Sequence, residues 1–471
     1  MAERRWLALY MLCTGELMIV LDTTIVNVAL PTIQADLAFS DAALVWVMNG
    51  YMLTYGGFLL LGGRLGDLYG QRRLFLLGVT LFTVASLACG ISGSQGMLVA
   101  ARAVQGLGGA VVSAIALSLI MNLFTAAGER AKAMGIFSFV CAGGGSLGVL
   151  AGGLLTSVLG WHAVFLVNLP IGIAVYAYCM KLLPRDEHQP AGRLDVWGAL
   201  TITSSLMLAV YGIVNGNQAG WRSAQTLGLL GAAAALLAVF LVLEARVPAP
   251  LVPLRLFRIR SVAAANVMGM FWAVAMFAWF FLSALYMQLV LGYDPMQIGL
   301  AFLPSNLIMA AFSIGWSAKV VMRFGLRGPI VAGMLLSAVG LALFVFAPAD
   351  ASFLVHILPG MVLLGVGCGL AMNPVIMAAM NDVAPSESGL ASGVVNTSFM
   401  MGGALGLAVL AAVAAARSGG QQTPEALTAG YHAAFTLAAL FALAAALVST
   451  LLPRAPSPAR PQSDFLAQET R

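Results

Sequence analysis

Hydrophobic residues occur along this chain in long runs that short polar segments separate. Fourteen of these runs are poor enough in charge, and at roughly 20 residues long enough, to cross a bilayer as α-helices. The pattern therefore predicts an all-α integral membrane protein. We place its fourteen transmembrane helices at residues 6–30, 42–63, 74–93, 96–121, 133–157, 163–181, 196–214, 223–243, 261–291, 298–318, 328–347, 353–380, 388–416 and 431–452.

The composition excludes a soluble protein. Of the 471 residues, 61% are hydrophobic and only 9% are charged, whereas about a quarter of the residues in a soluble domain are charged. The predicted loops are too short to hold a catalytic domain, and no lysine follows a glycine, which excludes a P-loop. We therefore predict no enzyme activity, no cofactor and no metal site.

The basic residues indicate the orientation of the helices, because cytoplasmic loops carry an excess of Lys and Arg. If the N-terminus is cytoplasmic, all but three of the 23 basic residues fall on the cytoplasmic side. The exceptions are Arg222 and Arg417 outside and Arg102 within a helix. This predicts a multi-pass protein of the cell membrane with both termini in the cytoplasm. The net charge of +5 follows from this topology and indicates no nucleic-acid partner.

Two carboxylates, Glu16 and Asp22, interrupt the first predicted helix in "LCTGELMIVLDTTIVNVALP". A charged side chain at the bilayer centre costs about 2.5–3.5 kcal/mol on insertion scales, so such residues mark functional sites. Arg102 is the natural partner of Asp22, either in a static pair that fixes helix packing or in a site where Asp22 carries a proton and Arg102 tunes it. Glu16, about 9 Å away along the helix, is a second proton site or selects cations.

The segment after the second predicted helix carries a spaced motif, "GGRLGDLYGQRRLFLLG". Gly63 and Gly70 suit a tight turn, and Asp67, Arg72 and Arg73 suit an ionic clip between helices. A plain basic connector would also contain such residues. The full spacing resembles the signature loop of the major facilitator superfamily. A fainter copy, "GWSAKVVMRFGLRG", follows the tenth predicted helix and suggests duplicated halves.

Further segments resemble one branch of that superfamily, the fourteen-helix drug:proton antiporters of the EmrB/QacA type. They are "LDTTIVNVALP", "ARAVQGLGGAVV", "LGVLAGGLLTSVLGWHAVFLVNLPIG" and "LYMQLVLGYDPMQIGLAFLP". The resemblance implies a six-helix bundle at residues 1–190, two inserted transmembrane helices at 191–250 and a second six-helix bundle at 251–455. It also implies binding near the midplane and alternating access. The Pro-rich, polar residues 456–471 predict a disordered cytoplasmic tail.

The fifth-helix motif departs from the branch at one position. Val149 stands where the usual G-P-x-x-G-G has proline, so we expect this helix to keep its backbone hydrogen bond and to kink less. Gly144, Gly148 and Gly152 recur every four residues, and Gly153 follows them. This stripe predicts close packing against another helix.

The candidates for the substrate cavity are Asn27, Tyr51, Gln105, Trp272 and Gln288. The ninth predicted helix, "MGMFWAVAMFAWFFLSALYMQ", is rich in aromatic residues and methionine, which either pack in the core or form an adaptable surface for varied lipophilic substrates.

The resemblance implies a proton-coupled antiporter that exports hydrophobic, cationic drugs or toxic metabolites. Proton-coupled uptake of a specific metabolite and a non-transporting membrane sensor are the alternatives. The expected partners are the lipid bilayer, protons, a small lipophilic substrate and, where the host has an outer membrane, a periplasmic adaptor.

Overall fold

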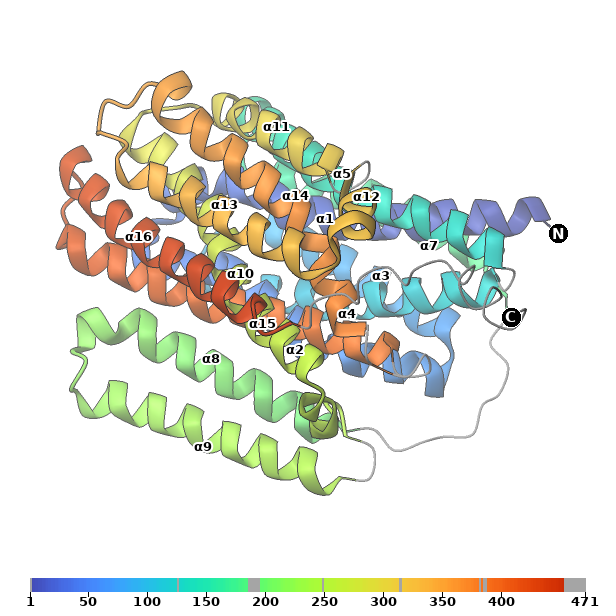
Figure 1. Cartoon of the computed structure of the whole chain (residues 1–471). Coiled ribbons are helices and arrows are strands. Elements are labelled where there is room, and N and C mark those ends of the chain that lie inside the picture. Colours follow the sequence, from blue (N-terminus) through green and yellow to red (C-terminus); the bar gives the residue numbers. More distant parts are fainter. Residues whose placement is uncertain are drawn as a thin grey trace, which may run out of the picture.

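The computed structural model describes residues 2–124, 127–184, 195–247, 250–312, 316–380, 383 and 388–452. All regular secondary structure in these ranges is helical, and most helices run along one common direction (Figure 1). The helices of the N-terminal part are α1 (Ala2–Leu37), α2 (Asp41–Tyr69), α3 (Gln71–Gly90), α4 (Gln95–Leu123), α5 (Ala127–Leu159), α6 (Ala163–Leu166) and α7 (Asn168–Leu182). The remainder are α8 (Val196–Ala219), α9 (Ala224–Arg246), η1 (Leu254–Arg258), α10 (Arg260–Leu285), η2 (Tyr286–Val290), α11 (Pro295–Ala311), α12 (Ser317–Phe324), α13 (Arg327–Val345), η4 (Phe353–Ile357), α14 (Leu358–Met380), α15 (Ser388–Ser418) and α16 (Pro424–Ser449).

Within the described ranges, twelve helices are long and apolar enough to cross a membrane, whereas the sequence predicts fourteen. The predicted spans 133–157 and 298–318 correspond to shorter apolar helical stretches, Leu147–Leu159 and Pro295–Ala311. Leu147–Leu159 is the C-terminal part of the 33-residue helix α5, and Pro295–Ala311 is the whole of α11. The described residues thus support twelve of the fourteen predicted spans.

Two other boundaries differ from those predicted. The first helix continues through Pro31 to Leu37 instead of ending at residue 30. The predicted span 163–181 is divided into α6 and α7, which Val167 separates. Elsewhere the bounds of the apolar runs and of the helices agree to within about seven residues, and helices end where polar residues can cap them. Ser94, for example, accepts a hydrogen bond from the Met97 backbone N–H at the start of α4.

The helices pack in two groups. In the first group α1 contacts α5 and α7, and α4 contacts α2 and α3. In the second, α10 contacts α15 and α16, α13 contacts α14 and α16, and α11 contacts α14. The contacts of α5 with α11 and of α2 with α15 join the two groups. Any relative movement of the groups must therefore act on these two helix pairs.

The hairpin α8–α9 lies along one edge of this assembly (Figure 1). Helix α9 packs against α8, while α8 also contacts α2 and α15. Thr203 of α8 abuts Gly57 of α2, where an added Cβ would lie 1.9 Å from the threonine Oγ1. Further along α8, the Asn217 side chain donates a hydrogen bond of 2.6 Å to the Ala412 carbonyl of α15. Helix α8 is thus attached to both groups.

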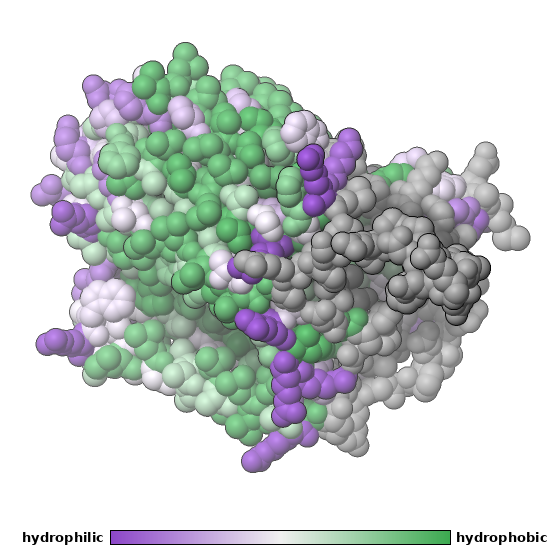
Figure 2. All heavy atoms as spheres, viewed as in Figure 1, coloured by the Kyte–Doolittle hydropathy of each residue, from purple (hydrophilic) through white to green (hydrophobic). Residues whose placement is uncertain are grey.

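The surface matches a membrane environment. Figure 2 shows a broad hydrophobic surface between two ends where hydrophilic residues gather. Large apolar side chains on the outer faces of the helices are exposed, among them Leu227 and Leu241 of α9. Such a surface is stable against lipid and would be an aggregation hazard in water.

Candidate functional site: a buried carboxylate–guanidinium network

Asp22 lies near the middle of α1 and its side chain is fully buried. Its carboxylate accepts three hydrogen bonds from side chains of two other helices. Arg102 Nη1 donates to Oδ2 at 2.5 Å, and Gln105 Nε2 and Asn168 Nδ2 donate to Oδ1 at 2.7 and 3.0 Å. A buried charge needs this degree of compensation.

Arg102 of α4 is also fully buried. Besides Asp22, its guanidinium donates to the Val47 backbone carbonyl of α2 at 3.0 Å and to Gln105 Oε1 at 2.7 Å. The guanidinium carbon lies 4.4 Å from the centroid of the Tyr51 ring, within the range of a cation–π contact. The structure therefore brings the first-helix acid and the intramembrane arginine into direct contact.

Two members of this network were not predicted from the sequence, Ser86 of α3 and Asn168 of α7. The Ser86 hydroxyl accepts from Gln105 Nε2 at 2.8 Å and from Asn168 Nδ2 at 3.3 Å. Asn168 could have been recognised from the sequence, because it is a carboxamide within the apolar run "VFLVNLPIG". Ser86 could not have been recognised in this way, since serine is common in membrane helices.

Glycines in α4 make this arrangement possible. A Cβ on Gly106 would lie 2.2 Å from Thr54 Oγ1 and 2.4 Å from the Tyr51 carbonyl oxygen, both in α2. A Cβ on Gly108 would lie 2.6 Å from the Phe82 nitrogen in α3. Without side chains at these positions α4 packs closely against both neighbours, and Arg102 can reach the α2 backbone.

Glu16 is buried on α1 but does not belong to this network. Its carboxyl group faces Ser113 of α4, and its Oε2 atom has no hydrogen-bond partner within the part of the chain that the structure describes. The two acids of α1 thus occupy separate environments.

The glycine stripe of α5 packs against α1, as its spacing predicts. A Cβ on Gly144, Gly148 or Gly152 would lie 3.0 Å or less from atoms of α1, and the nearest atom to Gly152 would be the Ile25 carbonyl oxygen at 2.7 Å. Gly153 instead faces the start of α11, where an added Cβ would lie 2.8 Å from the Pro295 carbonyl oxygen. With valine in place of proline, α5 is one unbroken helix through Val149.

The predicted turn after the second helix is smaller than expected. Gly63 and Asp67 lie within α2, and only Gly70 forms the turn, with a φ of 100° between α2 and α3. Positive φ favours glycine. The side chain of Asp67 lies outside the described residues. Arg72 donates a hydrogen bond to the Met180 carbonyl of α7, and Arg73 is in the first turn of α3.

The second copy of this motif has the same backbone feature. Gly325 has a φ of 70° and separates α12 from α13. Both copies therefore use one glycine with positive φ to end one helix and begin the next.

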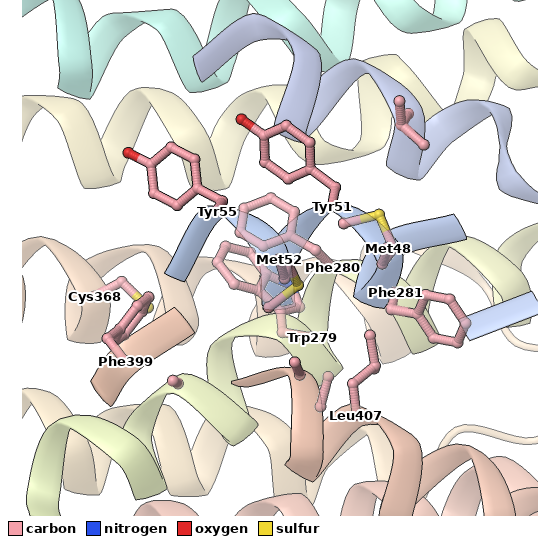
Figure 3. Packing of buried hydrophobic residues seen from close by; sticks show 14 of the residues in the cluster. Met48, Tyr51, Met52, Tyr55, Trp279, Phe280, Phe281, Cys368, Phe399 and Leu407 are labelled. Carbon is pink, nitrogen blue, oxygen red and sulfur yellow. The ribbon is translucent and has the colours of Figure 1, made fainter. Parts of the chain in front are cut away.

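The five cavity candidates do not converge on one site. Tyr51 and Gln105 belong to the Asp22–Arg102 network. Asn27 donates to the Thr23 carbonyl of its own helix, Trp272 packs against Phe399 of α15, and the partly exposed Gln288 lies in η2. Figure 3 shows the buried cluster to which Tyr51 belongs, in which aromatic and sulfur-containing side chains of α2 and α10 gather.

The sequence profile of the Major Facilitator Superfamily matches residues 12–407 and 268–470. A cephamycin export protein of Amycolatopsis lactamdurans is 40% identical over 95% of this chain and 92% of its own length. A puromycin resistance protein of Streptomyces alboniger is 38% identical over 95% of this chain and 90% of its own length. A multidrug resistance protein of Mycobacterium tuberculosis is 38% identical over 85% of this chain and 74% of its own length.

Two solved structures have a similar fold. The nucleoside transporter NupG superposes with a TM-score of 0.67 at 12% identity, covering 95% of this chain and 99% of that one. A bacterial homologue of the lysosomal transporter Spinster, in an inward-facing and unoccupied conformation, gives 0.65 at 17% identity, covering 97% and 99%.

Proposed function

This chain belongs to the major facilitator superfamily, and we propose that it is a proton-coupled efflux transporter of hydrophobic, cationic drugs or toxic metabolites. Support for export comes from relatives that align over nearly the whole chain and whose names describe antibiotic export or resistance. A multi-pass membrane protein of this family acts on small molecules by transport rather than by catalysis.

One observation carries proton coupling: Asp22 is a fully buried acid in a membrane helix, and all its partners donate hydrogen bonds. When Asp22 is ionised, these donors hold α1, α4 and α7 together. A proton on the carboxyl group removes the charge that attracts Arg102 and replaces one acceptor position with a donor. Protonation therefore loosens these contacts, and release of the proton restores them. A difference of this kind between two protonation states is what a proton-driven conformational change requires.

We propose that the chain has fourteen transmembrane helices, the twelve candidate spans together with α5 and α11. We also propose that it belongs to the EmrB/QacA-type branch of the family. Residues 1–190 and 251–455 then form the two bundles, and 191–250 the inserted pair. Both termini lie in the cytoplasm of a bacterial cell, and the tail 456–471 lies outside the described residues. We further propose that Asp67 helps to close the cytoplasmic side by interacting with the N-terminus of the helix that begins at Ser388, because a helix N-terminus attracts an anion.

Transport by purified protein in proteoliposomes tests this function. With an imposed pH gradient, ethidium should move in the direction opposite to protons, and collapsing the gradient should stop the movement. Movement of dye and protons in the same direction would support uptake, and binding without transport would support a sensor. Activity of the purified chain alone would show that a periplasmic adaptor is not needed for the transport step.

A further inference from the structure

Asn306 of α11 is a fully buried carboxamide without a hydrogen-bond partner. Neither Nδ2 nor Oδ1 is paired within the part of the chain that the structure describes. Buried polar side chains are nearly always paired, and an unpaired one costs free energy. Its neighbour Ser305 is equally buried but donates to the Phe302 carbonyl of its own helix. An apolar side chain would avoid the cost of an unpaired carboxamide, so the presence of asparagine here calls for another explanation.

The neighbours of Asn306 along α11 indicate which helices it faces. It lies eleven residues after Pro295, about 17 Å along α11. Gly299, two turns earlier on the same face, packs against the Val149 carbonyl of α5, where an added Cβ would be 3.0 Å away. Phe302, one turn earlier, packs against Trp279 and Phe280 of α10. Asn306 therefore faces the region where α5 and α10 meet α11.

Two buried indoles on α10 also carry a polar group that lacks a hydrogen-bond partner. The Nε1 atoms of Trp272 and Trp279 have no hydrogen-bond partner among the described residues. The two residues are seven positions apart, so both lie on one face of α10. Trp279 packs on Phe302 of α11, and Trp272 on Phe399 of α15. An indole N–H can only donate, so each of these groups needs an acceptor.

We propose that Asn306, Trp272 and Trp279 form a recognition site for hydrogen-bond acceptors on an otherwise apolar substrate, such as ester, amide or ketone oxygens. This inference rests on the proposed export function. The indole N–H groups and the Asn306 amide donate to the substrate, while the surrounding aromatic rings and methionines contact its apolar parts. The C-terminal group then selects substrates by hydrogen bonding, whereas Asp22 in the N-terminal group binds the proton.

Two lipophilic cations of different chemistry test the proposal. Rhodamine 6G has an ester carbonyl, and tetraphenylphosphonium has no hydrogen-bonding group. Binding of each is measured by titration of purified protein, and export is measured in proteoliposomes. Asn306→Leu should weaken rhodamine 6G binding about 3–10-fold, the value of one hydrogen bond, and should leave tetraphenylphosphonium binding unchanged. Trp279→Phe, which keeps the ring and removes the N–H, should show the same selective loss.

Ser305→Ala is the matched control, because it removes a buried polar group of the same helix that already has a partner. It should change neither affinity. Equal weakening of both cations by Asn306→Leu, or no weakening of rhodamine 6G by either variant, would overturn the proposal. If the wild-type protein exports neither cation, the export function itself fails. If the leucine variant does not fold, the Trp279→Phe result decides.

Discussion

Replacing Asp22 by asparagine separates the stabilising role of the buried pair from its role in coupling. The substitution keeps the shape of the side chain and removes its charge. Three donors now face this side chain, from Arg102, Gln105 and Asn168. Asparagine has one acceptor oxygen and one donor nitrogen, so at least one of the three contacts becomes a donor facing a donor.

The structure sets the size of the effect. Removing one partner of a buried ion pair costs about 3–5 kcal/mol. Arg102 keeps the Val47 carbonyl, Gln105 Oε1 and the Tyr51 ring. We therefore expect the low end of this range, about 3 kcal/mol, which is roughly two powers of ten in the unfolding equilibrium. Asp22→Asn combined with Arg102→Gln removes both charges and should recover most of the lost stability, since no charge is then left unpaired.

Two assays are needed. Thermal unfolding in detergent measures stability, and efflux driven by an imposed pH gradient in proteoliposomes measures coupling. The single variant should lose both gradient-driven efflux and stability while it still binds substrate. The double variant should regain stability without regaining efflux. Efflux by Asp22→Asn in response to a pH gradient would refute the assignment of the proton to Asp22. Additive stability losses in the double variant would show that the pair is not energetically coupled.

Four further predictions follow from the same structure. Glu16→Gln should reduce export of cationic substrates more than of neutral ones, measured as the ratio of their KM values, and an equal effect on both would argue against cation selection. Asp67→Asn should slow transport but leave folding and substrate binding intact, because a latch worth about 0.3–2 kcal/mol shifts a two-state balance only severalfold; unchanged efflux would make this segment a plain connector. A cysteine that replaces Arg222 should react with impermeant thiol reagents from outside the cell, and one that replaces Arg258 should not. Labelling at position 258 would show that the predicted topology is wrong. Gly152→Ala should destabilise the protein by about 1–3 kcal/mol, because its Cβ would lie 2.7 Å from the Ile25 carbonyl oxygen; a melting temperature equal to wild type would contradict the close α1–α5 contact.

The sequence was most informative where a residue conflicted with its surroundings. Asp22 and Arg102 are charges in apolar runs, so each predicts the other as its partner. Asn168 and Ser86 could not be assigned in this way, because hydrogen bonding between helices depends on which helices are neighbours, and hydropathy carries no information on that. Asn306 was missed for the same reason.

The positions of helix ends were predicted less well for a local reason. Glycine occurs both in turns and in the interior of closely packed membrane helices. Gly63 and Gly70 look alike in sequence, yet only Gly70 has a positive φ. The first span was likewise predicted to end at residue 30, but α1 continues through Pro31 to Leu37, as membrane helices tolerate proline.

The two attachments of α8 have a mechanical consequence. Thr203 and Asn217 are fourteen residues apart, about 21 Å along a helix that cannot stretch, and they bind α8 to different groups. Rocking of one group against the other changes the separation of these anchor points, so α8 must slide at one of them. Near Thr203, Ile202 of α8 also packs against Met401 of α15, so this end of α8 touches both groups, whereas the Asn217 end adds a hydrogen bond worth about 0.5–1.5 kcal/mol to α15 alone. The inserted hairpin therefore couples α2 to α15, and any rocking of the groups must shift α8 against one of these two helices.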